Sequence, residues 1–165
     1  MTTPTPPTPN PAGPAPNPDT TDAVQTALSA EYAAVWSYTL VTAFLSDSLK
    51  PAAQRDLQAH RARRDATIRL LTDHGVGARA AEPAYRTPRP VTDSDSAVAL
   101  LMSAETDVAA AWRSVIERCD SPGLRRTALD GLTEGATLLA RWAVESGVKP
   151  PIAALPGQSQ TPPAR

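Results

Sequence analysis

Two glutamates occupy positions where the spacing of apolar residues predicts core side chains. Between residues 22 and 49 the apolar positions recur every three or four residues, as in an amphipathic helix, only if Glu31 is counted among them. Between residues 93 and 119 the same holds for Glu105. Because a buried carboxylate is costly unless it is paired or bound to a metal, both acids need a partner inside the protein.

Metal binding is the first chemistry that such acids could perform. Four-helix bundles that hold two metal ions place one Glu on each of two helices and a Glu-x-x-His pair on each of the other two. Glu31 and Glu105 fit the single-acid positions, and His60 fits a histidine position, although Leu57 replaces the acid three residues before it. Glu134 has no histidine three residues later. The metal hypothesis is therefore an incomplete site for iron or manganese with the candidate ligands Glu31, His60, Glu105 and Glu134.

An internal ion-pair network is the second chemistry, and the sequence favours it. Arg64 follows His60 by four residues, so both lie on one face of the predicted helix 51–74. Its planar guanidinium matches carboxylates and would reach between Glu31 and Glu105. We therefore expect a structural network of Glu31, His60, Arg64 and Glu105 without a cofactor, whereas Arg63 is expected on the solvated face.

Four predicted helices must position these residues, at about 22–49, 51–74, 93–119 and 122–146. N-cap residues, prolines in first turns and Gly75 and Gly147 mark their ends. The 16-residue connection 76–91 lacks a helical period, and at roughly 53 Å when extended it exceeds a helix of roughly 37 Å. An all-α four-helix bundle with short, long and short connections has the ferritin-like connectivity. Gly131 and Gly135 indicate a groove for a large neighbour, Trp36 or Trp112.

Composition bounds the function. The chain has 165 residues and a net charge of -1, and 18 prolines gather mainly in the segments 1–20 and 150–165, which we expect to be tails around a single domain at 21–149. No apolar run suggests a membrane span, and no basic patch suggests nucleic-acid binding. The single Cys119 fits a reduced compartment, so we expect a cytoplasmic location. The Pro/Thr-rich start would also suit a linker that follows a removed export or lipoprotein signal.

Two segments, 30–38 and 59–65, resemble an uncharacterised ferritin-like family found mainly in actinobacteria. The segments 85–93, 105–113 and 140–142 agree with it, and the resemblance covers about residues 22–157. It implies a ferritin-like fold and no established activity.

These observations favour a non-catalytic structural or interaction bundle, which we expect to form a homodimer. No phosphate-binding loop, Cys/His cluster or nucleophile elbow is present in the sequence, so no catalytic or cofactor-binding residues are assigned. One alternative is a metal-binding oxidoreductase or iron-handling protein with a degenerate site. Another is a carrier that holds a small ligand in a pocket between helices.

Overall fold

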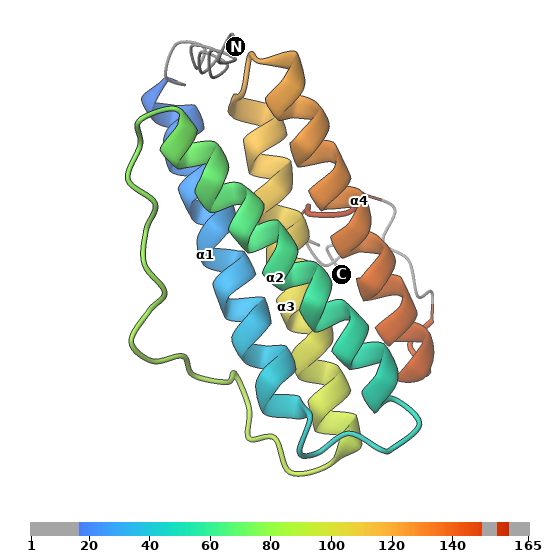
Figure 1. Cartoon of the computed structure of the whole chain (residues 1–165). Coiled ribbons are helices and arrows are strands. Elements are labelled where there is room, and N and C mark those ends of the chain that lie inside the picture. The colour runs from blue at the N-terminus through green and yellow to red at the C-terminus, as the bar shows by residue number, and fades with distance from the viewer. Residues whose placement is uncertain (1–16, 150–154, 159–165) are drawn as a thin grey trace, which may run out of the picture.

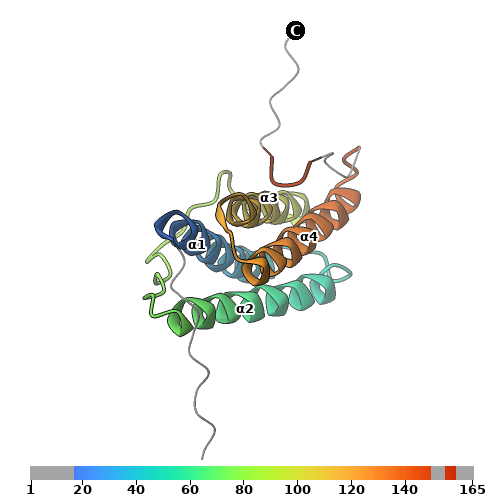
Figure 2. The ribbon, with the colours of Figure 1, turned by 90° about the horizontal axis from the view of Figure 1, so that it is seen from above.

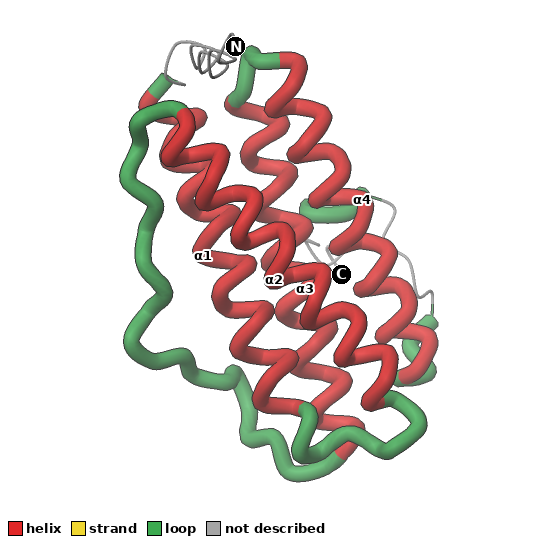
Figure 3. Tube along the Cα trace, viewed as in Figure 1, coloured by secondary structure: helices red, strands yellow, loops and turns green. Residues whose placement is uncertain are grey.

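The computed structural model describes residues 17–149 and 155–158, and the regular secondary structure in these ranges is entirely helical (Figure 3). The helices are α1 Pro18–Val41, α2 Lys50–Asp73, α3 Ser94–Arg118 and α4 Pro122–Glu145. Helices α1 and α4 run in one direction and α2 and α3 in the other (Figure 1). The predicted all-α four-helix bundle is therefore confirmed. Within the described ranges, no helix is long and apolar enough to cross a membrane.

Three of the four helices begin and end within about one residue of the expected positions, but α1 does not. It begins at Pro18 because Asn17 caps it, accepting a 2.7 Å hydrogen bond from the Thr20 amide. It ends at Val41 instead of residue 49, since the chain turns there and buries Leu45. The following residues 46–48 are Ser-Asp-Ser, whose side chains favour turns over helix. The remaining residues of the expected tails, 1–16, 150–154 and 159–165, lie outside the described residues.

The long connection between α2 and α3 runs alongside α1 from one end of the bundle to the other (Figure 1). The buried Gln25 of α1 anchors its start, because the side-chain amide donates to the Gly77 carbonyl (2.6 Å) and accepts from the Arg79 amide (2.9 Å). Farther along, the ring centres of Tyr85 and Trp36 lie 5.5 Å apart. The predicted crossover, with Tyr85 packed against the bundle, is confirmed.

Seen along the bundle, α2 and α3 lie on opposite sides of a common centre, as do α1 and α4 (Figure 2). The buried apolar residues form two clusters, one around Leu28, Leu71 and Trp112 and the other around Leu101 and Trp142. The fully buried Glu31, His60 and Glu105 belong to neither apolar cluster. The core is therefore two apolar clusters together with a polar group.

Close packing of α4 on α3 depends on glycine. A Cβ atom at Gly131 would lie 2.7 Å from the indole ring of Trp112, and one at Gly135 would lie 3.2 Å from Cγ1 of Val108. The expected groove is thus filled by Trp112, while Trp36 is only partly buried and packs against the crossover.

Candidate functional site

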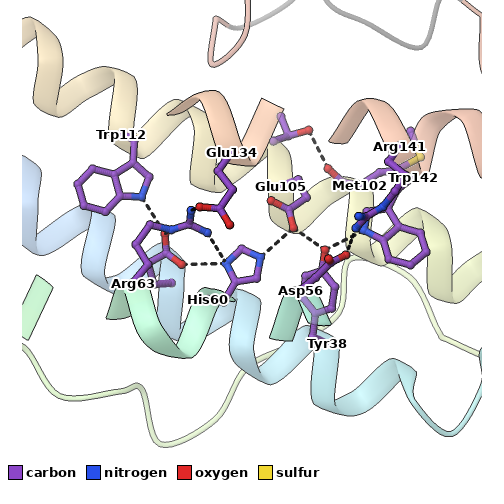
Figure 4. A network of polar contacts seen from close by, with 12 residues as sticks. Tyr38, Asp56, His60, Arg63, Met102, Glu105, Trp112, Glu134, Arg141 and Trp142 are labelled. Carbon is purple, nitrogen blue, oxygen red and sulfur yellow. Dashed lines mark hydrogen bonds and ion pairs between the residues drawn. The ribbon is translucent and has the colours of Figure 1, made fainter. Parts of the chain in front are cut away.

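Glu31, His60 and Glu105 meet inside the bundle, and all three side chains are fully buried. Figure 4 shows His60 pointing toward Glu105. Nδ1 of His60 lies 2.8 Å from Oε2 of Glu31, and Nε2 lies 2.9 Å from Oε1 of Glu105. The three helices α1, α2 and α3 each supply one of the three residues. The structure therefore brings together two acids from the apolar seams and the histidine between them.

His60 is an imidazolium ion in this arrangement, because each ring nitrogen faces a carboxylate oxygen and so must donate a proton. Burial alone would lower the pKa of His60, but hydrogen bonds to Glu105 and Glu31 and their negative charges outweigh it and raise the pKa to about 9. Burial would likewise raise the pKa of Glu31, yet the hydrogen bond from His60 and the charge of Arg63 hold it below its usual value.

Arg63, and not Arg64, supplies the second cation. Its Nε atom donates to Oε1 of Glu31 at 2.7 Å, and its Nη1 atom donates to Oε2 of Glu134 at 2.6 Å. Arg64 instead contacts the neighbouring Asp65 and lies over the ring of Tyr32, so the expectations for the two arginines are corrected.

The physical reason is the helical register of α2. Its buried side continues through Asp56, His60, Arg63 and Thr67 in steps of four, three and four, so residue 64 is one position off this stripe. The side chain of Arg63 is only 11% exposed. Glu134, one of the candidate metal ligands, is joined to Glu31 through this arginine, and its own side chain is 47% exposed.

Aromatic side chains from α1, α3 and α4 add further hydrogen bonds to this network (Figure 4). Nε1 of Trp112 donates to Oε1 of Glu31 at 2.7 Å, and the hydroxyl of Tyr38 donates to Oε1 of Glu105 at 2.5 Å. Nε1 of Trp142 in turn donates to the Tyr38 hydroxyl at 2.8 Å. Burial and the charge of Glu105 raise the pKa of Tyr38, so its hydroxyl keeps the proton that it donates.

A second ion pair joins α2 to α4 next to this network. Arg141 of α4 donates a hydrogen bond to the buried Asp56 of α2, and its guanidinium lies 5.3 Å from the ring centre of Trp142. Burial raises the pKa of Asp56, and the charge of Arg141 opposes this effect. Sequence reasoning missed this pair and the three aromatic donors.

One sequence signal connects these missed residues. On each helix an acid precedes an aromatic or arginine hydrogen-bond donor by seven positions, which is about two helical turns. The pairs on α1 and α3 are Glu31 with Tyr38 and Glu105 with Trp112; those on α2 and α4 are Asp56 with Arg63 and Glu134 with Arg141. The contacts cross between antiparallel helices. Glu31 of α1 accepts from Trp112 of α3, and Glu105 of α3 accepts from Tyr38 of α1. In the same way, Glu134 of α4 accepts from Arg63 of α2, and Asp56 of α2 accepts from Arg141 of α4. The repeated spacing therefore predicts the contacts once the helices are known to be antiparallel.

Residues 23–160 match the family described as "Domain of unknown function (DUF4439)". The chain belongs to this family. It is also similar to a conserved hypothetical protein, rv2844, from Mycobacterium tuberculosis, whose crystal structure is 32% identical in sequence and superimposes with a TM-score of 0.76. That similarity covers 78% of this chain and 98% of the other. No curated protein matches the sequence. The family assigns no activity to the DUF4439 domain, so its function must be argued from the site.

The site of this DUF4439 domain does not fit a metal ion as it is arranged. Both nitrogens of His60 are engaged by carboxylates, and an imidazolium cannot act as a ligand. Among residues 17–149 and 155–158, no group of three or more His, Cys, Asp or Glu side chains is arranged to hold a metal. The arrangement can neutralise charge and hold a proton between two acids. Metal binding by Glu31, His60, Glu105 and Glu134 stays a prediction.

Proposed function

We propose that this DUF4439 domain is a non-catalytic, ferritin-like structural or interaction bundle in which two internal cations replace a di-metal site. The observation that carries the proposal is that His60 bonds Glu31 and Glu105 through its two ring nitrogens. With Arg63 also on Glu31, two positive charges balance two buried negative charges. A metal ion would have to displace this neutralised set, and burying the additional charge is costly.

The ferritin-like part of the proposal is supported by the connections between helices. Short turns join α1 to α2 and α3 to α4, and the long crossover joins α2 to α3. Ferritin-like bundles have this order of connections and carry acids in the bundle core. Glu31 on α1 and Glu105 on α3 have the corresponding placement in the core.

For the interaction role, we propose that the partner is a second copy of the chain. Large apolar side chains are exposed on or just after α4, namely Leu129 (53%), Val144 (62%) and Val148 (45%). Covering them would remove apolar surface from water, which favours association. Sedimentation equilibrium over a wide concentration range is expected to give a dimer mass, and a monomer mass at every concentration would exclude self-association.

A metal-binding oxidoreductase or iron-handling protein with a degenerate site is the second candidate. The observation that favours it is Oε2 of Glu105, which is buried and has no hydrogen-bond partner among the described residues. A free carboxylate oxygen is a hard ligand suited to iron or manganese.

Metal analysis separates the two candidates. The full chain is purified in the presence of Fe(II) or Mn(II), and loosely bound ions are removed. The number of metal ions per chain is then measured by elemental mass spectrometry. We expect less than about 0.1 metal ion per chain, since the acids are already neutralised. Binding of about one ion per chain would overturn the proposal and support the metal site.

A pair of variants tests the role of Arg63 as the second cation directly. Arg63→Met should lower the free energy of unfolding by about 2–3 kcal/mol, because it leaves Glu31 with one cation fewer in the core. The matched variant Arg64→Met should change it by only about 0.5 kcal/mol or less, because Arg64 makes a partly exposed contact with Asp65. Equal effects of the two variants in urea denaturation would contradict the role assigned to Arg63.

A further inference from the structure

A groove of about 480 Å³ lies between the first turns of α3 and the end of the crossover, away from the charge network. It adjoins a smaller hollow of about 110 Å³ between α1, α3 and the crossover, since Pro88, Leu100 and Ser103 line both. The half-buried rings of Trp36 and Tyr85 line the smaller hollow. We call the two together the crossover groove. Its size is that of a ligand site, and its lining is mainly apolar and aromatic.

The crossover groove offers hydrogen-bond donors that lack acceptors. Nε1 of Trp112 and Nε1 of Trp142 each donate to another side chain, whereas Nε1 of Trp36 has no acceptor among residues 17–149 and 155–158. Within the same ranges, the hydroxyl of Ser103 has no partner either. The Tyr85 hydroxyl accepts from a backbone amide, so its own proton is free to be donated. A ligand rich in acceptors would therefore satisfy the groove.

Neither sign of charge dominates the crossover groove. Two arginines, Arg86 and Arg89, line it together with two acids, Asp95 and Asp107. Because these formal charges cancel, the lining selects neither an anion nor a cation. Together with the apolar walls and the free donors, the charge balance favours an uncharged ligand that has carbonyl acceptors and few N–H groups.

A proline-rich segment has these properties. In the polyproline II conformation the backbone makes no internal hydrogen bonds, so its carbonyl groups are free to accept, and proline has no N–H group. Such segments bind aromatic-lined grooves. The chain itself carries one outside the described ranges, since residues 4–9 are Pro-Thr-Pro-Pro-Thr-Pro and residues 1–16 contain no ionisable side chain.

The segment is long enough to reach the crossover groove. Trp36 lies 18 positions after Pro18 on α1, which is about 27 Å along the helix. Polyproline II advances about 3.1 Å per residue, so residues 8–16 would span about 28 Å on the way back. We propose that the crossover groove binds a proline-rich segment in the polyproline II conformation, and that its occupant is residues 4–9 of the same chain. This binding site goes beyond the structural role proposed above.

The proposal is tested on the full, ¹⁵N-labelled chain through its indole N–H signals in NMR spectra. The 4–9 variant combines the substitutions Pro4→Ala, Pro6→Ala, Pro7→Ala and Pro9→Ala. It should shift the Trp36 signal and speed the exchange of that proton with water, because the acceptor supplied by the segment is lost. The signals of Trp112 and Trp142 should not change, since their N–H groups are bonded inside the bundle. The matched control, Pro14→Ala with Pro16→Ala, should leave the Trp36 signal in place.

A synthetic peptide of residues 3–10 provides a second test. Added to the 4–9 variant, it should shift the Trp36 signal in a saturable manner. It should bind the unchanged protein at least about 10-fold more weakly, because the tethered segment competes at an effective concentration in the millimolar range. A peptide with alanine at every proline should also bind at least about 10-fold more weakly, because it is not held in polyproline II. Ala99→Arg, added to the 4–9 variant, fills the groove from an exposed position and should abolish peptide binding without changing the melting temperature.

The proposal is overturned by a Trp36 signal that is the same in the 4–9 variant and in the unchanged protein. It is also overturned by the absence of a saturable shift in about 5 mM peptide, which corresponds to an affinity too weak for a built site. Equal peptide affinities of the two proteins would show that the groove is not occupied by its own segment. A Trp36 signal that changes on dilution from about 1 mM to about 10 μM protein would assign the occupant to a second copy and overturn the intramolecular contact. Unchanged peptide binding with Ala99→Arg would place the ligand elsewhere and would overturn the site.

Discussion

The α1–α2 and α3–α4 hairpins carry matching polar positions, but they differ at the centre of the bundle. When the sequence of α2 is aligned with that of α4 so that Asp56 matches Glu134, Arg63 matches Arg141. In this alignment His60 of α2 corresponds to Leu138 of α4. The first hairpin supplies an imidazolium where the second supplies an apolar side chain. The asymmetry leaves a single central cation to serve both buried acids.

The two acids are consequently satisfied to different degrees. Glu31 accepts hydrogen bonds from His60, Arg63 and Trp112 on its two oxygens. Glu105 accepts from His60 and Tyr38 on the same oxygen. Its other oxygen, Oε2, is one of two buried side-chain atoms without a hydrogen-bond partner in the described part of the chain.

The other such atom is Nε of Arg141. Its counterpart in the first hairpin, Nε of Arg63, is the atom that donates to Glu31. Among the described residues, the second hairpin thus has the pair between Arg141 and Asp56, which corresponds to the pair between Arg63 and Glu134, but lacks a bond from Arg141 to Glu105. The comparison teaches that the network is strongest around Glu31 and weakest around Glu105.

Replacing His60 by leucine makes the first hairpin resemble the second and should have the largest effect. His60→Leu leaves Glu31 and Glu105 without the cation between them, so we expect the free energy of unfolding in urea to fall by about 3–5 kcal/mol. The control is His74→Leu, since His74 is the other histidine of the chain and its ring hydrogen-bonds the Leu70 carbonyl near a helix end, away from the two buried acids. A loss below about 1 kcal/mol for His60→Leu would contradict the central role of the imidazolium.

The pH dependence of the free energy of unfolding should also report the charge of His60. The pKa of His60 rises from 6.5 to about 9 on folding, so protonation favours the folded state. This contribution, about 3 kcal/mol, is fully present below pH 6.5 and is lost as the pH rises through about 9. Urea denaturation at pH 6 and pH 10 measures it, and the difference between the unchanged protein and His60→Leu isolates it from other groups. A difference between the two proteins that does not change with pH would mean that His60 is not charged.

The fold was predictable because its signals are local. The three-and-four spacing identifies the helices, and N-cap residues, prolines and Gly75 mark most of their ends. The end of α1 was not predictable in this way, since the apolar spacing continues through Leu45 and Leu49. Leu45 is buried from a turn rather than from a helix. Periodicity shows that a residue is buried, and it does not by itself show the backbone that buries it.

The site was predictable in part for the same reason. Glu31 and Glu105 interrupt apolar seams, so their burial could be inferred from each helix alone. The choice between Arg63 and Arg64 depends on the rotation of α2 against its neighbours, which a single helix does not specify. Trp112, Tyr38 and Trp142 fit the core as apolar rings, and their polar atoms become relevant only when another helix brings an acceptor.

Two glycines provide the smallest test of the comparison between the hairpins. In the alignment, Gly131 and Gly135 of α4 correspond to Ala53 and Leu57 of α2, so the second hairpin packs through backbone where the first uses side chains. Gly131→Ala would place a methyl group 2.7 Å from the buried Trp112 ring, which the hydrogen bond to Glu31 holds in place.

Gly131→Ala should therefore cost about 1–2 kcal/mol in the free energy of unfolding, even after the gain of about 1 kcal/mol in helix propensity. It should also shift the indole N–H signal of Trp112. In Gly135→Ala the new Cβ atom would lie 3.2 Å from Cγ1 of Val108, and a small movement of that methyl group would relieve the contact. The gain in helix propensity should therefore roughly cancel the cost of this contact in the free energy of unfolding. Equal stabilities of the two variants would show that the Trp112 ring moves freely, and the hydrogen bond from Trp112 would then contribute little to holding Glu31.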